Sequence, residues 1–161
     1  MFQFLWSNLW GQMLMTLLIS MVPIIELRGA IPIAVSAGLP FYIAIPLAVI
    51  GNLIPVPFII MFIKHIFGWI RRKMPKLNSM IDKLEARAHS KSEAVQKSAF
   101  WGLFIFVAIP LPGTGAWTGA LIAAMMDMRL KKALPAIVAG VLTAGAIVTI
   151  VTALGVDIFV K

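Results

Sequence analysis

The chain has 161 residues, of which 61% are hydrophobic and 12% charged, with a formal net charge of +8 and a mean hydropathy of +0.98. Soluble domains carry about 25% charged residues, so this composition argues strongly against a soluble globular enzyme. The apolar residues form long charge-free stretches of the length that fills a hydrocarbon core of about 30 Å. We therefore expect an all-α integral membrane protein, a single multi-pass domain in the cell membrane.

Residues 1–12 predict an amphipathic helix. Apolar residues, two tryptophans among them, recur at helical spacing, and polar residues occupy the other face. Such a helix is suited to the membrane interface. Neither Lys nor Arg precedes Arg28, so the segment has no basic region of the kind that begins a secretory signal peptide.

Residues 13–38 predict a re-entrant hairpin that enters the membrane from outside. The stretch is interrupted between Pro23 and Pro32, and the halves on either side are too short to span a bilayer comfortably. These two prolines and Gly29 are the expected structural residues of the hairpin tip. Residues 41–63 are free of charge and predict a full transmembrane helix.

Residues 64–97 hold nine of the 14 lysines and arginines and predict a basic cytoplasmic loop with a break at Pro75 and a surface helix after it. Cytoplasmic segments of membrane proteins carry the excess of Lys and Arg. Ser90 and Glu93 have the spacing of a capping box, so a helix is expected to begin there. We expect the loop to lie on anionic lipid headgroups, in preference to a catalytic or nucleic-acid role.

Residues 98–126 predict a second re-entrant hairpin, which enters from the cytoplasm. Pro110 and Pro112 break this apolar run in its middle, and each half reaches only the bilayer midplane. The basic residues at 129–132 then also face the cytoplasm. Residues 133–156 predict a second full transmembrane helix, which places both termini outside.

Two features favour an inverted repeat. Pro23 and Pro110 each precede a hairpin turn, and the pattern Pro-x4-Gly recurs at 46–51 and 135–140. One hairpin opens outward and the other inward, so related halves must be inverted. Inverted repeats with broken helices that meet at the midplane are an architecture of secondary transporters. The two hairpin tips are therefore expected to face each other.

Glu26 and Arg28 are the only charged residues among the first 63. Each costs about 2.5–3.5 kcal/mol at the membrane centre on insertion scales, so both are candidates for function. Glu26 is the predicted site of proton or ion coupling. Arg28 has a planar fork suited to phosphate or carboxylate and is predicted to bind substrate. The alternative is a structural brace, in which the two neutralise each other or bond to free carbonyls.

The second hairpin tip carries no charge but offers hydroxyl groups, an indole and free backbone amides. A helix N-terminus with free N–H groups favours an anion, whereas the alternative is that the glycines only permit close packing. Without cysteine and with two histidines outside the predicted core, we expect no metal, no cofactor and no catalytic residue. The candidate substrate-binding residues, besides Arg28, are Gly113, Thr114, Gly115, Trp117, Thr118 and Asn52, and Gly119 is counted with the tip.

The segments 23–32 and 110–119 resemble the small multidrug export protein family, and the resemblance covers nearly the whole chain. That family is similar to the DedA (SNARE-associated, VTT-domain) membrane proteins, whose fold pairs two opposed re-entrant hairpins. The resemblance implies a transporter with a DedA-like inverted repeat. DedA proteins typically carry arginines in the second hairpin, and this chain has none there.

We predict a small transporter, not an enzyme, that exports an amphipathic or anionic small molecule with coupling through Glu26. One alternative is a flippase or scramblase for a lipid carrier resembling undecaprenyl phosphate, and another is a membrane scaffold or assembly factor. The expected partners are membrane lipids, the substrate and a second copy of the chain, without nucleic acid. The expected homodimer interface is a stripe of small residues, Ala136, Gly140 and Ala144.

Overall fold

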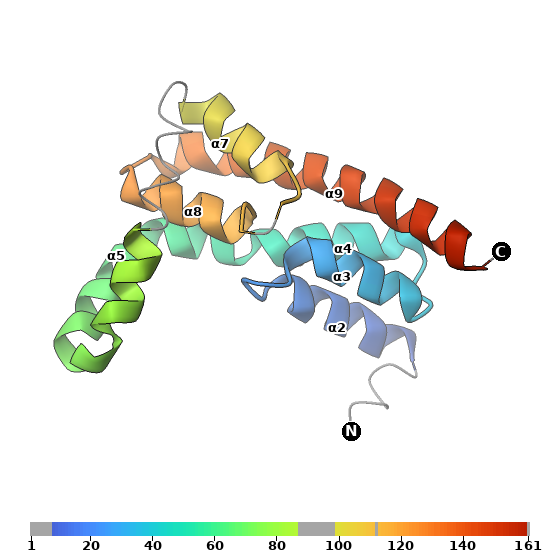
Figure 1. The fold of residues 1–161 in the computed structure, drawn as a ribbon, viewed down its shortest axis with the longest axis horizontal. Coiled ribbons are helices and arrows are strands. Elements are labelled where there is room, and N and C mark those ends of the chain that lie inside the picture. The colour runs from blue at the N-terminus through green and yellow to red at the C-terminus, as the bar shows by residue number, and fades with distance from the viewer. Residues whose placement is uncertain (1–7, 87–98, 112, 161) are drawn as a thin grey trace.

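The computed structural model describes residues 8–86, 99–111 and 113–160, and within these ranges every regular element is a helix (Figure 1). This confirms the predicted all-α class. Residues 1–7 of the predicted interfacial segment, residues 87–97 of the predicted basic segment and Pro112 lie outside the described residues. The helices are α2 (Leu9–Ser20), α3 (Glu26–Ser36), α4 (Phe41–Leu53), α5 (Pro55–Lys73), the 3-10 turn η1 (Pro75–Leu77), a helix over 78–86, α7 (Ala99–Ala108), α8 (Ala116–Met125) and α9 (Leu130–Val160).

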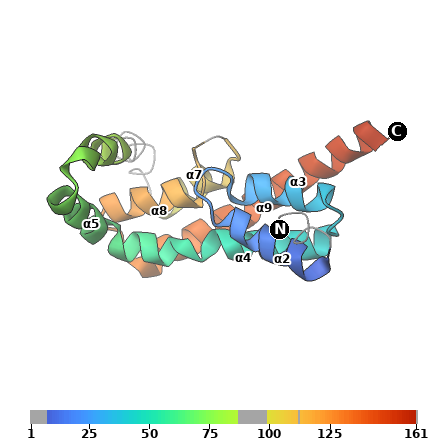
Figure 2. The same ribbon diagram turned by 90° about the horizontal axis from the view of Figure 1, so that it is seen from below.

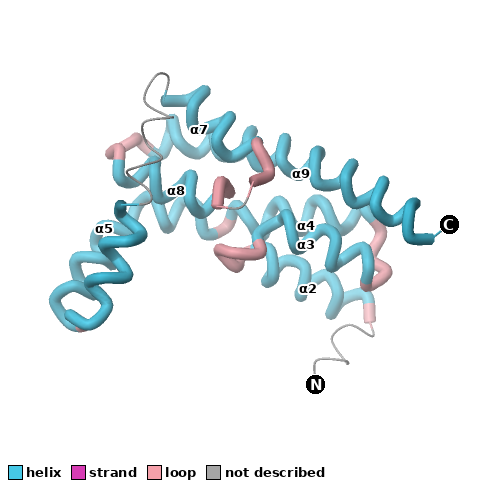
Figure 3. The backbone as a smooth tube through the Cα atoms, viewed as in Figure 1, coloured by secondary structure: helices cyan, strands magenta, loops and turns pink. Residues whose placement is uncertain are grey.

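Two helical hairpins occupy the places where the chain is interrupted. Helices α2 and α3 are joined by residues 21–25, and α7 and α8 by residues 109–115. The hairpins point toward each other, and their loops lie together near the middle of the molecule (Figure 3). Helix α2 begins at Leu9, where the Asn8 side chain caps it by accepting the N–H of Gly11 at 2.6 Å. The expected boundary between residues 12 and 13 therefore falls inside one continuous helix.

The helix predicted over 41–63 continues to Lys73. Ile54, between α4 and α5, keeps helical dihedral angles (φ −53°, ψ −49°), so the chain forms an apolar helix over Phe41–Lys73. Three basic residues end this helix, where cations are favourable to the helix dipole. With Leu130–Gly155, the described part of the chain has two helices long and apolar enough to cross a membrane. The first part of the predicted basic loop is therefore helical.

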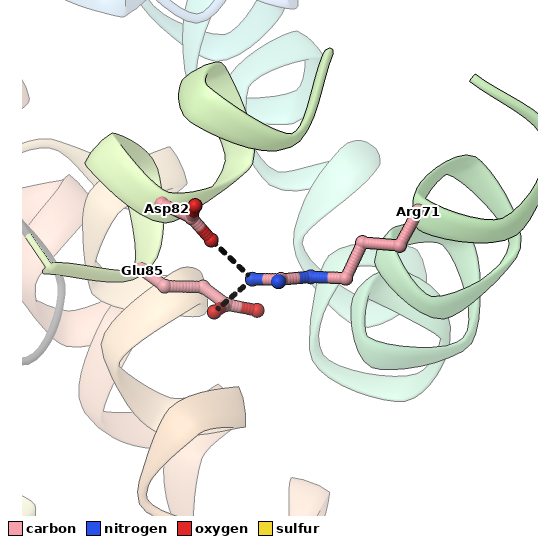
Figure 4. Close-up of polar contacts among 3 residues, drawn as sticks. All are labelled: Arg71, Asp82 and Glu85. Atoms are coloured by element: carbon pink, nitrogen blue, oxygen red, sulfur yellow. Dashed lines mark hydrogen bonds and ion pairs between the residues drawn. The ribbon is translucent and has the colours of Figure 1, made fainter. Parts of the chain in front are cut away.

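The C-terminal part of α5 and the helix over 78–86 form an arm that projects from the bundle (Figure 2). Arg71 joins the two helices by donating to Asp82 at 2.6 Å and to Glu85 at 2.8 Å (Figure 4). Phe67 and Ile81 are the arm's buried apolar residues. Exposed ion pairs contribute about 0–1 kcal/mol, so the buried residues stabilise the arm at least as much as the charges.

Several positions in the two halves of the chain match at a spacing of 89 residues. Pro135 follows Pro46 by 89 residues, and Gly140 follows Gly51 by the same number. The expected pairing of Pro23 with Pro110 is therefore two residues out of register. Helices α4 and α9 run in opposite directions, as an inverted repeat requires (Figure 1). Five pairs of residues at this spacing are buried in both halves: Leu27 and Ala116, Ile31 and Ala120, Ala34 and Ala123, Ala44 and Ala133, Ala48 and Ile137.

The small-residue stripe of α9 lies inside the chain. Ala136 and Ala144 are buried, and a Cβ added to Gly140 would meet the side chain of Val107 and the carbonyl oxygen of Phe104 on α7. The absence of a side chain at Gly140 therefore allows α7 to approach α9. The expected role of this stripe as a dimer interface is wrong, because α7 of the same chain covers it. The homodimer itself stays a prediction.

Gly140→Ala is expected to lower the free energy of unfolding by about 1–3 kcal/mol, because the added methyl group overpacks the contact with α7. Thermal unfolding in detergent micelles measures the loss. Gly68→Ala is the matched control, since no atom lies within 4 Å of a Cβ at Gly68. Equal stability of the two variants would contradict the proposed packing, and so would a Gly140→Ala variant whose only defect is in oligomeric state.

Candidate functional site

Arg28, in the first turn of α3, binds the end of α7. Its guanidinium donates to the carbonyl of Leu111 at 2.6 Å, to that of Ile109 at 3.2 Å and to the hydroxyl of Thr114 at 3.2 Å. The last carbonyls of a helix lack helical partners, and a cation there is favourable to the helix dipole. Arg28 of the first hairpin therefore caps the first helix of the second hairpin.

Glu26, the first residue of α3, binds the start of α8, the second helix of the second hairpin. Its Oε1 accepts the backbone N–H of Trp117 at 3.3 Å, at the start of α8, where an anion is favourable. The side chain is 4% exposed, and a Cβ added to Gly115 would overlap its carboxylate. Glu26 also has a φ of +50°, which is uncommon outside glycine and is often found at functional sites.

Trp117 returns a bond from the second hairpin to the first. Its indole Nε1 donates to the carbonyl of Met21 at 3.0 Å, directly after α2. Trp117 is 89 residues after Arg28, so the two are equivalent in the repeat and each donates to the end of the first helix of the opposite hairpin. Each tip thus donates hydrogen bonds to backbone carbonyls of the other, and those of Ile109 and Leu111 also accept from Thr114 within their own tip. Non-helical backbone at membrane depth requires such partners.

Glu26 and Arg28 do not form an ion pair with each other: no charged nitrogen of one lies within 4.0 Å of a carboxylate oxygen of the other. The brace interpretation therefore has no direct ion pair between the two side chains, whereas Arg28 does bond to backbone carbonyls. The left-handed turn at Glu26 and the helical turn after it direct one side chain to α8 and the other to α7. Glu26 Oε2 and Arg28 Nε are buried without a hydrogen-bond partner.

Two cavities adjoin the hairpin tips. One has a volume of about 820 Å³ and lies between α3 and α9, and the other has a volume of about 390 Å³ and lies beside the loop that precedes α3. Arg28 and Pro110 line both cavities and therefore separate them. The smaller cavity contains most of the predicted site residues: Pro23, Glu26, Arg28, Gly29, Pro110, Gly113, Gly115 and Thr118.

The remaining predicted residues are placed differently. Thr114 and Trp117 take part in the hydrogen bonds between the tips, and Pro32 lines the larger cavity. Asn52 is buried in α4, its amide has no hydrogen-bond partner, and it lines neither cavity. The structure places Gly119 against Val107 of α7, which is a packing role.

Most residues of the larger cavity could not be found from the sequence. Ile147, Val148, Val151 and Thr152 line it from α9, and Val35 and Ser36 from α3. An apolar helix that is hydrophobic on all sides carries no periodicity that would mark a face. The role of backbone carbonyls such as that of Leu111 could not be predicted from the sequence either, although the helix break at Pro110 indicates that carbonyls without helical partners exist there.

The comparisons with known proteins give one match. A family model described as "Putative small multi-drug export protein" matches residues 26–147, which is more than half of the chain. The match begins at Glu26 and includes both helices of the second hairpin. No curated protein and no solved structure matches the chain, and no comparison links it to the DedA proteins. The chain therefore belongs to the small multi-drug export protein family.

Proposed function

We propose that this protein exports small amphipathic or anionic molecules across the cell membrane, past the contact between its two hairpin tips. The family is described as one of exporters, and two helices have the length and composition of membrane spans. The observation that carries the proposal is the meeting of the two cavities at Arg28 and Pro110. This contact would have to move for a substrate to pass from one cavity to the other.

The proposal places both hairpins in the membrane as re-entrant elements of a DedA-like fold, with residues 64–97 in the cytoplasm. The four hairpin helices have 12, 11, 10 and 10 residues. At 1.5 Å per residue they are about 15–18 Å long, or roughly half of a 30 Å hydrocarbon core. The bonds between the tips support this placement, because they provide partners for backbone groups that would be costly to expose to lipid.

Within this proposal Glu26 carries the coupling proton and Arg28 binds the acidic group of the substrate. Glu26 lines the smaller cavity and leaves Oε2 unpaired, as a carboxyl group that exchanges a proton with entering water would. Among the residues that the structure describes, Arg28 is the one charged residue that lines the larger cavity. Gly113 and Thr118 line the same cavity as Glu26 and are the remaining candidates for substrate contact.

Two other functions each have an observation in their favour. The apolar lining of the larger cavity beside one guanidinium also suits a lipid with an acidic headgroup, as a flippase or scramblase would need. The reciprocal bonds between the tips also suit a rigid scaffold that transports nothing.

Reconstitution into liposomes distinguishes the three functions. We expect gradient-dependent movement of an amphipathic compound when an anionic dye, a cationic dye and a fluorescent lipid phosphate are tested under an imposed pH gradient. Transfer of the lipid phosphate alone would favour the flippase. If none of the compounds moves under any gradient, the exporter proposal fails and the scaffold remains.

The proposed topology predicts that a cysteine at Lys131 is protected from a membrane-impermeant thiol reagent added outside intact cells. The chain has no native cysteine, so a single introduced one reports its own position. Tyr42→Cys, at the start of α4 and 77% exposed, is expected to react from outside. Reaction at position 131 from outside would contradict the second re-entrant hairpin.

A further inference from the structure

The larger cavity lies on one side of the 89-residue repeat. It lies between α3 and α9, and shifting its lining residues by 89 positions leads to the facing surfaces of α8 and α5. The shift pairs Val35 with Ala124, Ser36 with Met125, Val148 with Ile59, and Thr152 with Ile63.

At the equivalent place the two helices are closed on each other. Helix α5 packs along α8, and Ile59 and Ala124 are 6% and 4% exposed. Their counterparts in the open cavity, Val148 and Val35, are only partly buried. The equivalent surfaces are thus packed to different degrees: α3 and α9 touch but leave a cavity between them, whereas α5 and α8 are packed closely.

An ion pair holds the closed side at its end. Lys64 of α5 lies 2.7 Å from Asp127, which lies in the turn after α8 and has a φ of +52°. The equivalent residues on the open side are Ala153 and Gly38, which have no charges to pair. The two sides therefore differ in a contact that is solvent-exposed and easily broken.

We propose that the surface between α5 and α8 opens as a second substrate cavity while the cavity between α3 and α9 closes. The proposal rests on the export function proposed above and gives it two alternating entrances. Both cavities would end at the hairpin tips, at Arg28 on one side and at its equivalent Trp117 on the other. The substrate class that fits both is a molecule with an apolar body, because the second cavity would be lined by Phe58, Ile59, Phe62, Ile63, Leu121 and Met125.

Paired spin labels test the exchange, since the chain has no cysteine of its own. One pair, Ser36→Cys with Thr152→Cys, spans the open side, and the other, Ile63→Cys with Met125→Cys, spans the closed side. Distances are measured by pulsed electron paramagnetic resonance in phosphatidylcholine nanodiscs. We expect each label pair to show a short and a long distance. A change that favours the long distance in one pair should favour the short distance in the other. A single distance for each pair under all conditions would overturn the proposal.

Asp127→Asn provides the shift, because it removes one charge of the ion pair on the closed side. Loss of an exposed ion pair can change the ratio of the closed to the open arrangement by up to about fivefold. We expect Asp127→Asn to increase the fraction of molecules with the long distance across α5 and α8. The fraction with the short distance across α3 and α9 should increase with it. Asp82→Asn is the matched control, as Asp82 is also in an exposed ion pair but in the projecting arm. Equal effects of the two variants would overturn the assignment.

Cross-linking separates this proposal from the proposed function. A reducible cross-link across either label pair should abolish transport in liposomes, and reductant should restore it. If the wild type transports and both cross-linked forms transport equally well, alternating access is wrong while the export function stands. If the wild type moves no compound but the label distances exchange, the export function fails while the two-cavity exchange stands.

Discussion

Gly115→Ala is expected to displace the Glu26 carboxylate and abolish transport. A Cβ at Gly115 would occupy the space of that carboxylate, which is buried and bonded to the Trp117 N–H. Overpacking of this kind lowers the free energy of unfolding by about 1–3 kcal/mol. The thermal unfolding midpoint in micelles and gradient-driven transport in liposomes measure the two effects.

The pairing with Glu26 is tested by the double variant Glu26→Ala/Gly115→Ala. Removal of the carboxylate makes room for the methyl group, so the double variant should be more stable than the sum of the single losses predicts. Gly68→Ala should leave both stability and transport nearly unchanged, because nothing lies within 4 Å of its Cβ. A Gly115→Ala variant with wild-type activity would contradict the described site.

Substitution of Glu26 or Arg28 should have effects as large as those of Gly115→Ala. Glu26→Gln keeps the shape of the side chain and removes its titration, so gradient-driven transport should be lost while the protein still inserts and folds. Arg28→Gln removes the charged donor of the Ile109 and Leu111 carbonyls, which keep hydrogen bonds from Leu111 and Thr114 of their own loop, so the loss of stability should be about 1–3 kcal/mol in all. Arg28→Lys should be intermediate, since lysine lacks the planar fork. Transport rates and unfolding midpoints are measured for each variant.

The double variant Glu26→Gln/Arg28→Gln distinguishes the two origins of these losses. Because the side chains bind different helix ends and form no ion pair with each other, their effects on stability should add. Recovery of stability in the double variant would show that they neutralise each other after all. Full gradient-coupled transport by the double variant would refute the site assignment.

The sequence by itself determined the class of the protein and the places where its helices break. Low charge and long apolar runs predict membrane helices, because they leave no polar surface for water. The prolines at 23 and 110 predict interruptions, and the structure has loops at 21–25 and 109–115. The repeated Pro-x4-Gly pattern indicated two related halves, and it also has the spacing of 89 residues that the burial pattern shows. Hydropathy and proline each affect the chain within a few residues, so their effects can be predicted from the sequence.

Only the tertiary structure decided which groups meet. The partners of Glu26 and Arg28 lie more than 75 residues further along the chain, on helices whose ends come together only through packing. The same holds for the lining of the larger cavity and for Gly140, which contacts α7 rather than a second chain. In helices that are apolar on every side, sequence periodicity does not mark which face turns to lipid and which to protein, because both environments accept the same residues.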